Sequence, residues 1–138
     1  MSTKKKERAY DWIIHYVFSE EEDIEYSSDI HTHGISKYNH PELMLCLSIP
    51  QELACGILNY VGEEIRNGKR FDREEIRCDI LANEMPVKLV RREFGEEERM
   101  VIILPDENGK FPEDNGCKEP YNKQLEMIDE FQKQYKEK

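Results

Sequence analysis

Hydrophobic residues recur at every second position in several short stretches of the chain. From Tyr10 to Phe18, aromatic and aliphatic residues follow this spacing, which is typical of a strand, although a helical stripe also fits the same residues. The acidic, polar residues 19–29 are expected to form a loop. The pattern over residues 71–85 is ambiguous and predicts neither a helix nor a strand. Short apolar or alternating runs predict four more strands, at residues 30–35, 43–47, 86–93 and 100–104.

The pattern changes to a helical period between Pro50 and Asn67. Apolar residues there recur three or four positions apart, and Pro50 suits the first turn of a helix. Ser48 is a candidate N-terminal cap, and Asn67-Gly68 is a typical left-handed end. A second helix is expected from about residue 120 onward. The core is predicted to include Leu53, Ile57, Leu58, Val61, Val101 and Ile103.

The predicted elements follow the order strand, strand, strand, helix, strand, strand, helix. Strands that cluster in this way, with a helix on one face, favour the α+β class over a doubly wound sheet. We therefore predict a single α+β domain over residues 10–138. Its mainly antiparallel sheet, of about four to six strands, packs against one central helix at residues 50–67, and a C-terminal helix follows. Residues 1–9, which include Lys4-Lys5-Lys6, are expected to form a flexible tail.

Charge and cysteine content narrow the possible partners. The chain has 20 basic and 30 acidic residues and a formal net charge of −10, so binding of nucleic acid through its phosphates is not expected. No stretch approaches the ~20 apolar residues of a membrane helix, and an acidic surface disfavours anionic membranes. The cysteines, Cys46, Cys55, Cys78 and Cys117, are widely spaced and form no Cys-x-x-Cys pair. Because the N-terminal lysines are not followed by the apolar core of a signal peptide, reduced thiols and a cytoplasmic location are expected.

The segment from Asp29 to Gly34, Asp-Ile-His-Thr-His-Gly, carries the residue types of a metal site. Residues two apart on a strand point to the same face, so His31 and His33 could hold one ion with Asp29 beside them. The segment resembles the metal-binding start of amidohydrolases, but their barrel needs ~250 residues, against 138 here. Because further ligands are missing near the pair, we expect no bound metal and no cofactor, and His31 and His33 stay lesser candidates. The other two histidines are His15 and His40.

Two separated blocks of polar and turn residues predict a different site. The first, His40-Pro41-Glu42-Leu43, leads into the strand at 43–47, and the second follows the strand at 100–104 and contains Asp106, Gly109 and Phe111. If these strands are neighbours, we expect their polar ends to meet at one edge of the sheet. The candidate ligand-binding residues are His40, Glu42, Asp106 and Phe111. The alternative is that these groups form a buried, hydrogen-bonded corner with no ligand.

The order of these blocks resembles the bacterial domain-of-unknown-function family DUF4262. The resemblance rests on Thr32-x-Gly34-Ile35, on the His-Pro-Glu-Leu block and on the block from Ile102 to Cys117, and it extends over residues 10–128. His31 and His33 depart from it, since members often carry an aromatic residue before the threonine and a valine after it. The resemblance implies no assigned activity.

Three classes of function remain open at this point. The first is a non-enzymatic module that binds a small molecule or a protein. The second is a small metal-dependent or acid/base enzyme that uses the region of His40, Glu42 and Asp106. The third is an acidic interaction or inhibitor protein, for which Glu20-Glu21-Glu22-Asp23 and Glu96-Glu97-Glu98 are the motive. An enzyme requires polar residues that converge in a pocket, and this decides between the classes.

Overall fold

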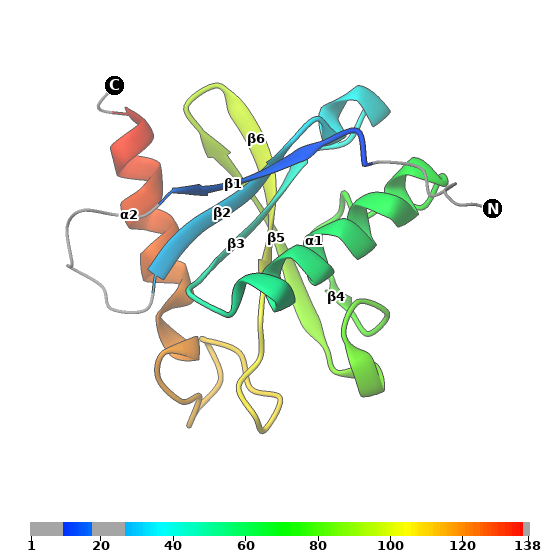
Figure 1. Ribbon diagram of the computed structural model, residues 1–138. Coiled ribbons are helices and arrows are strands. Elements are labelled where there is room, and N and C mark those ends of the chain that lie inside the picture. The colour runs from blue at the N-terminus through cyan, green and yellow to red at the C-terminus, as the bar shows by residue number, and fades with distance from the viewer. Residues whose placement is uncertain (1–9, 18–26, 137–138) are drawn as a thin grey trace.

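In the part of the chain that the structure describes, six strands form one mixed sheet, in the order β1-β2-β3-β6-β5-β4. A computed structural model describes residues 10–17 and 27–136, and in these residues the sheet carries one long helix on each side (Figure 1). The strands are β1 (Ile13–Val17), β2 (Ser27–His33), β3 (Glu42–Leu47), β4 (Ile76–Arg77), β5 (Val87–Phe94) and β6 (Glu97–Ile103).

Most of the sheet is antiparallel. β1 pairs with β2, β2 with β3, β5 with β6 and β4 with β5 in antiparallel fashion, whereas β3 and β6 run parallel. The parallel pair lies at the centre, because the chain leaves β3, forms helix α1 (Gln51–Arg66) and the β4–β5 region, and returns through β6. The predicted α+β class, with a mostly antiparallel sheet, a central helix and a C-terminal helix, is confirmed.

Strand β3 is covered on both faces. All six of its residues are buried, which explains its continuous apolar sequence. Met44 and Cys46 point to the side of helix α2 (Gln124–Lys136), where the Cys46 thiol donates to the carbonyl of Gln124 at 3.7 Å. By alternation, Leu43 and Leu45 point to the opposite side, which α1 covers.

Helix α1 packs with the predicted apolar stripe against the sheet. Ile57, Leu58, Val61 and Ile65 are buried, and Gly62 permits the ring of Trp12 to approach, since a Cβ there would lie 2.7 Å from it. Two predictions for this helix are wrong. Leu53 is 49% exposed, because it lies at the edge of the stripe, and Ser48 is no cap, because the helix begins after Pro50 without a side-chain cap.

Other differences concern the ends of elements. Strand β2 begins at Ser27, so the loop expected over residues 19–29 is wrong for its last three residues. Residues 71–85 contain the short β4. The C-terminal helix begins at Gln124 after one 3₁₀ turn. The tail expected at residues 1–9 lies outside the described residues. Neither α1 nor α2 is long and apolar enough to cross a membrane.

Two leucines of α1 offer a test of this packing. Leu58 is fully buried and Leu53 is half exposed. We expect Leu58→Ala to lower the free energy of unfolding by about 2–5 kcal/mol, because it removes buried methyl groups and leaves a cavity. The matched variant Leu53→Ala should change it by less than about 0.5 kcal/mol. Urea denaturation of both variants measures the difference, and equal effects would contradict the orientation of α1.

Candidate metal centre

A cleft of about 1170 Å³ opens on the side of the sheet that carries α2. Its wall combines side chains from several elements: histidines of β1 and β2, the β5–β6 hairpin around Gly95, and Tyr135 of α2. The polar residues that line it are His15, His31, His33, Ser36, Asn39, His40, Glu42, Arg70, Asp72, Arg91, Glu96, Glu97, Glu98, Arg99 and Tyr135. A concave site with converging polar groups is therefore present.

Strand pairing brings three histidines together in this cleft. His31 and His33 lie two residues apart on β2 and share a face. His15 of β1 lies directly opposite His31 in the antiparallel register, so it points to the same face. One ligand nitrogen from each ring can be chosen so that all three lie within 4.8 Å of one another. The ring centroids are 4.4–5.4 Å apart.

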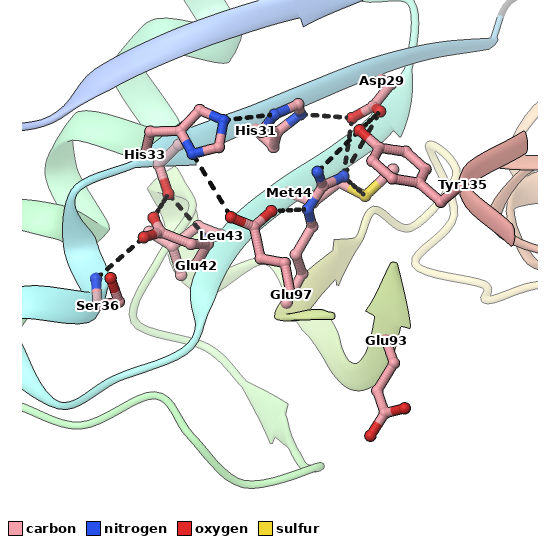
Figure 2. Close-up of polar contacts among 12 residues, drawn as sticks. Asp29, His31, His33, Ser36, Glu42, Leu43, Met44, Glu93, Glu97 and Tyr135 are labelled. Carbon is pink, nitrogen blue, oxygen red and sulfur yellow. Dashed lines mark hydrogen bonds and ion pairs between the residues drawn. The ribbon is translucent and has the colours of Figure 1, made fainter. Parts of the chain in front are cut away.

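Figure 2 shows a continuous line of contacts from Glu97 through both β2 histidines to Asp29. His31 Nδ1 lies 2.7 Å from Asp29 Oδ1, and His33 Nδ1 lies 3.4 Å from Glu97 Oε2. The two remaining nitrogens, His31 Nε2 and His33 Nε2, face each other at 3.3 Å. Each imidazole is thus held at one nitrogen by a carboxylate and presents the other nitrogen to its neighbour.

The two carboxylates favour one arrangement of the ring protons. An ionised carboxylate only accepts hydrogen bonds, so the nitrogen that faces it carries the proton. In a neutral imidazole the other nitrogen then holds a lone pair. Two lone pairs therefore face each other at 3.3 Å between His31 and His33. With the ring protons in these positions, a cation between the two nitrogens, either a proton or a metal ion, stabilises the pair.

Arg99 anchors the buried side of the cluster. It is 1% exposed and lies on β6. Its guanidinium donates to Asp29 Oδ1 at 3.2 Å, to Glu97 Oε1 at 2.8 Å and to the Tyr135 hydroxyl at 2.8 Å. The Tyr135 hydroxyl donates in turn to Asp29 Oδ2 at 2.9 Å. Both carboxylates that contact the histidines are therefore fixed by one arginine.

The electrostatics favour an ionised Asp29 and a neutral His15. Burial raises the pKa of Asp29, but the hydrogen bond with His31 and the charge of Arg99 outweigh burial and hold that pKa below its ordinary value. Burial lowers the pKa of His15, and the neighbouring His33 and His31 lower it further. A neutral imidazole is the form that binds a metal ion.

Glu42, a predicted ligand-binding residue, forms its hydrogen bonds with Thr32 and with the adjacent turn. It is 3% exposed and accepts hydrogen bonds from the Thr32 hydroxyl and from three successive backbone N–H groups, those of Gly34, Ile35 and Ser36, at 2.7–3.1 Å. Gly34, at φ 123°, gives the turn that points these N–H groups at one carboxylate. Burial raises the pKa of Glu42, but these hydrogen bonds outweigh it and lower the pKa overall.

His40 likewise stabilises the fold. Its Nδ1 donates to the carbonyl of Pro41 at 2.9 Å, and its Nε2 accepts the backbone N–H of Phe71 at 3.0 Å. Burial lowers the pKa of His40 and keeps the ring neutral, as this acceptor role requires. His40 and Glu42 line the cleft, but their polar atoms already have partners within the chain.

The predicted meeting of the two polar blocks is wrong. β3 and β6 are neighbours, but they are parallel, with Glu42 opposite Arg99. His40 therefore lies at the edge where both strands begin, whereas Asp106 lies beyond the end of β6, seven positions after Arg99, or roughly 20 Å along an extended chain.

Asp106 and Phe111 occupy their own corner of the fold. The Asp106 carboxylate accepts the backbone N–H groups of Asn108, Lys110 and Lys118 at 2.8–3.0 Å. The hydrogen bond from the Lys110 backbone, followed by those of Lys118 and Asn108, lowers the pKa of Asp106 in spite of burial. Phe111 is 6% exposed and belongs to the core. Neither residue lines the cleft.

Comparison with known families places the first polar block in context. The family model of DUF4262, a domain of unknown function, matches residues 7–101. The chain belongs to the DUF4262 family. No curated protein and no solved structure matches the chain.

The DUF4262 match includes most of the cluster. His15, His31, His33 and Arg99 lie within the matched residues, and so does the His-Pro-Glu-Leu block. Tyr135 and the second polar block, from Ile102 to Cys117, lie beyond them. The family match therefore covers the sheet face of the cleft but not the helix that contributes Tyr135.

Sequence reasoning missed four members of the site: His15, Glu97, Arg99 and Tyr135. The alternation over residues 10–18 did predict β1, and it places His15 on the face opposite the aromatic residues. A pairing of this strand with β2 would have added His15 to the His31–His33 pair. No comparable local signal distinguishes Arg99, which follows three glutamates and resembles a solvent-exposed residue.

The role of Glu42 can be tested by its dependence on pH. The pKa of this carboxyl is lower in the folded chain than the unfolded value of about 4.3, so its contribution is present above that value and is lost as the pH falls through the folded pKa. We expect Glu42→Gln to lower the free energy of unfolding by about 2–3 kcal/mol at pH 7, since an amide nitrogen then faces backbone N–H groups.

Urea denaturation at neutral and acidic pH measures this effect. The difference between the wild type and Glu42→Gln should shrink as the pH approaches the folded pKa of Glu42. The exposed Glu93 gives the control Glu93→Gln, which should stay within about 0.5 kcal/mol of the wild type. A Glu42→Gln variant as stable as the wild type at pH 7 would contradict the structural role.

Proposed function

We propose that this protein binds one divalent transition-metal ion, with zinc as the first choice, through His15, His31 and His33. The observation that carries the proposal is the 3.3 Å approach of His31 Nε2 to His33 Nε2 while both Nδ1 atoms face carboxylates. A metal ion between the two lone pairs converts their repulsion into two coordinate bonds.

The distances support a tetrahedral ion. Zinc binds imidazole nitrogen at about 2.0–2.1 Å, so two ligands at the tetrahedral angle lie about 3.3–3.4 Å apart. The His31–His33 separation of 3.3 Å matches this value. The His15 nitrogen is farther away, within 4.8 Å, and a rotation of its exposed side chain closes the remaining gap.

The surroundings of the rings also support a metal site. Metal-binding histidines generally donate their second ring nitrogen to a carboxylate or carbonyl, which fixes the ring and makes the ligand more basic. Asp29 is the carboxylate that contacts His31 Nδ1, and Glu97 is the one that contacts His33 Nδ1. Imidazole ligands suit zinc, copper, nickel and iron rather than magnesium or calcium, which prefer oxygen.

The sequence predicted a module that binds a small molecule or a protein, without a metal. The proposal keeps the binding module and makes its ligand a metal ion. The expectation of no metal rested on missing third and fourth ligands and on the departure of His31 and His33 from the family pattern. His15 supplies the third ligand. The function remains that of a binding module for a small ligand, now a metal ion. The cysteines are all unpaired thiols, which favours a reducing compartment such as the cytoplasm.

Metal binding can be measured directly. Protein purified without an affinity tag, stripped with a chelator and dialysed, should take up one equivalent of zinc in isothermal titration and elemental analysis. His33→Ala should lose stoichiometric binding, because it removes one of three ligands. If the wild type and His33→Ala bind zinc equally, or neither binds it, the proposal is wrong.

The carboxylate behind His33 gives a second test. We expect Glu97→Gln to weaken zinc binding by about 10–100-fold, the usual effect of removing a partner that orients a ligand. Glu93→Gln is the matched control, because Glu93 lies on the same hairpin but its side chain points away from the cluster (Figure 2). The zinc affinity of this variant should equal that of the wild type. Equal affinities for all three proteins would show that Glu97 does not orient His33.

A further inference from the structure

We propose that the bound metal keeps one coordination position open to the cleft, holds an ionisable water there, and hydrolyses small, uncharged carboxylic esters. This inference rests on the proposed metal site, and it goes beyond binding to a reaction.

The ligand set stops at three. Among the described residues, the cluster that can surround one ion consists of His15, His31 and His33. Zinc sites with a purely structural role are closed by four protein ligands, whereas three protein ligands leave a position for water or substrate. The three rings line the cleft of about 1170 Å³, so the fourth position faces a space that a small molecule can enter.

The neighbouring carboxylates are not free to close the site. Asp29 contacts Arg99, Tyr135 and His31, and its contact with His31 is at the nitrogen that faces away from His33. Glu97 uses one oxygen for Arg99 and the other for His33. To reach the metal, either carboxylate would have to leave the buried charge of Arg99 without a partner, which is strongly unfavourable.

The charge of the ligands favours an acidic water. Three neutral imidazoles leave the double positive charge of the ion uncompensated in its first coordination shell. A zinc ion with three histidine ligands lowers the pKa of its bound water to about 7. A hydroxide nucleophile would therefore be available at neutral pH, without a separate general base.

The charge of the cleft wall selects the substrate. Five carboxylates line the cleft, those of Glu42, Asp72, Glu96, Glu97 and Glu98, against three guanidinium groups, those of Arg70, Arg91 and Arg99. These groups have a net charge of −2, which a divalent ion neutralises. The cleft therefore gives a dianionic phosphate ester no net electrostatic attraction. A single ion also lacks the second metal that many phosphatases use. An uncharged carbonyl compound fits these conditions better.

The reaction balances with water as the only co-reactant. The oxygen of the metal-bound hydroxide forms a bond to the ester carbonyl carbon, and the carbonyl π electrons move to its oxygen. When the carbonyl re-forms, the bond from carbon to the alkoxy group breaks, and the alkoxide takes the proton of the added hydroxide and leaves as the alcohol. The carboxylate product then leaves the metal, and a new water binds and loses a proton to solvent.

Cobalt substitution tests the open position without any turnover. The protein loaded with Co²⁺ should show visible absorption of a four-coordinate ion, and added azide should change this spectrum in a saturable way as it replaces the water. If cobalt binds stoichiometrically but azide does not change the spectrum, the site is closed. That result would overturn this inference and leave the proposed metal binding intact. Failure to bind cobalt or zinc at all would instead overturn the proposed function.

Hydrolysis is then measured with two probes, 4-nitrophenyl acetate and 4-nitrophenyl phosphate. The zinc-loaded wild type should cleave the acetate at least about tenfold faster than both the metal-free protein and His33→Ala at the same total zinc, and the phosphate should not be cleaved above background. His15→Gln gives a second loss variant should His33→Ala fail to fold, and Glu93→Gln should behave as the wild type. Acetate cleavage equal to that of the metal-free protein overturns the reaction, and faster cleavage of the phosphate overturns the substrate class.

Discussion

Arg99 is a buried positive charge between the sheet and helix α2. Arg99 and Asp29 are each 1% exposed, and removing one member of such a buried pair costs about 3–5 kcal/mol, since the other charge is left without a partner. The partners of Arg99 come from β2, from β6 and, through Tyr135, from α2. The position of α2 against the sheet and the conformation of Asp29 therefore depend on the same charge.

This constraint gives the histidine cluster a fixed side and an adjustable side. His31 is buried and is held by Asp29, which Arg99 holds in turn. The His33 side chain is 42% exposed, and His15 is exposed. The site therefore has one fixed ligand, His31, and two ligands, His33 and His15, with room to adjust to an ion. Only a modest rearrangement is then needed on binding.

Much of the fold could be predicted from the sequence, because its evidence is local. The helical stripe over residues 50–67 and the apolar run at 43–47 each follow from the period of one element, and both are present in the structure. The relative position of His40 and Asp106 could not be predicted, because it depends on the direction in which two strands pair. Parallel and antiparallel neighbours can have the same apolar sequence, but only antiparallel pairing would have placed the end of β6 beside His40.

The histidine cluster was missed for a related reason. Within one strand, alternation can supply two ligands to the same face, as His31 and His33 do. A third ligand on that face must come from an adjacent strand, and its position is set by the pairing register rather than by its distance along the chain. His15 meets His31 because the β1–β2 register places them opposite each other, and a shift of one residue would turn His15 away from the cleft. For a metal site built on a sheet, the absence of a third ligand nearby in the sequence is therefore weak evidence against binding, and strand register is the quantity that has to be known.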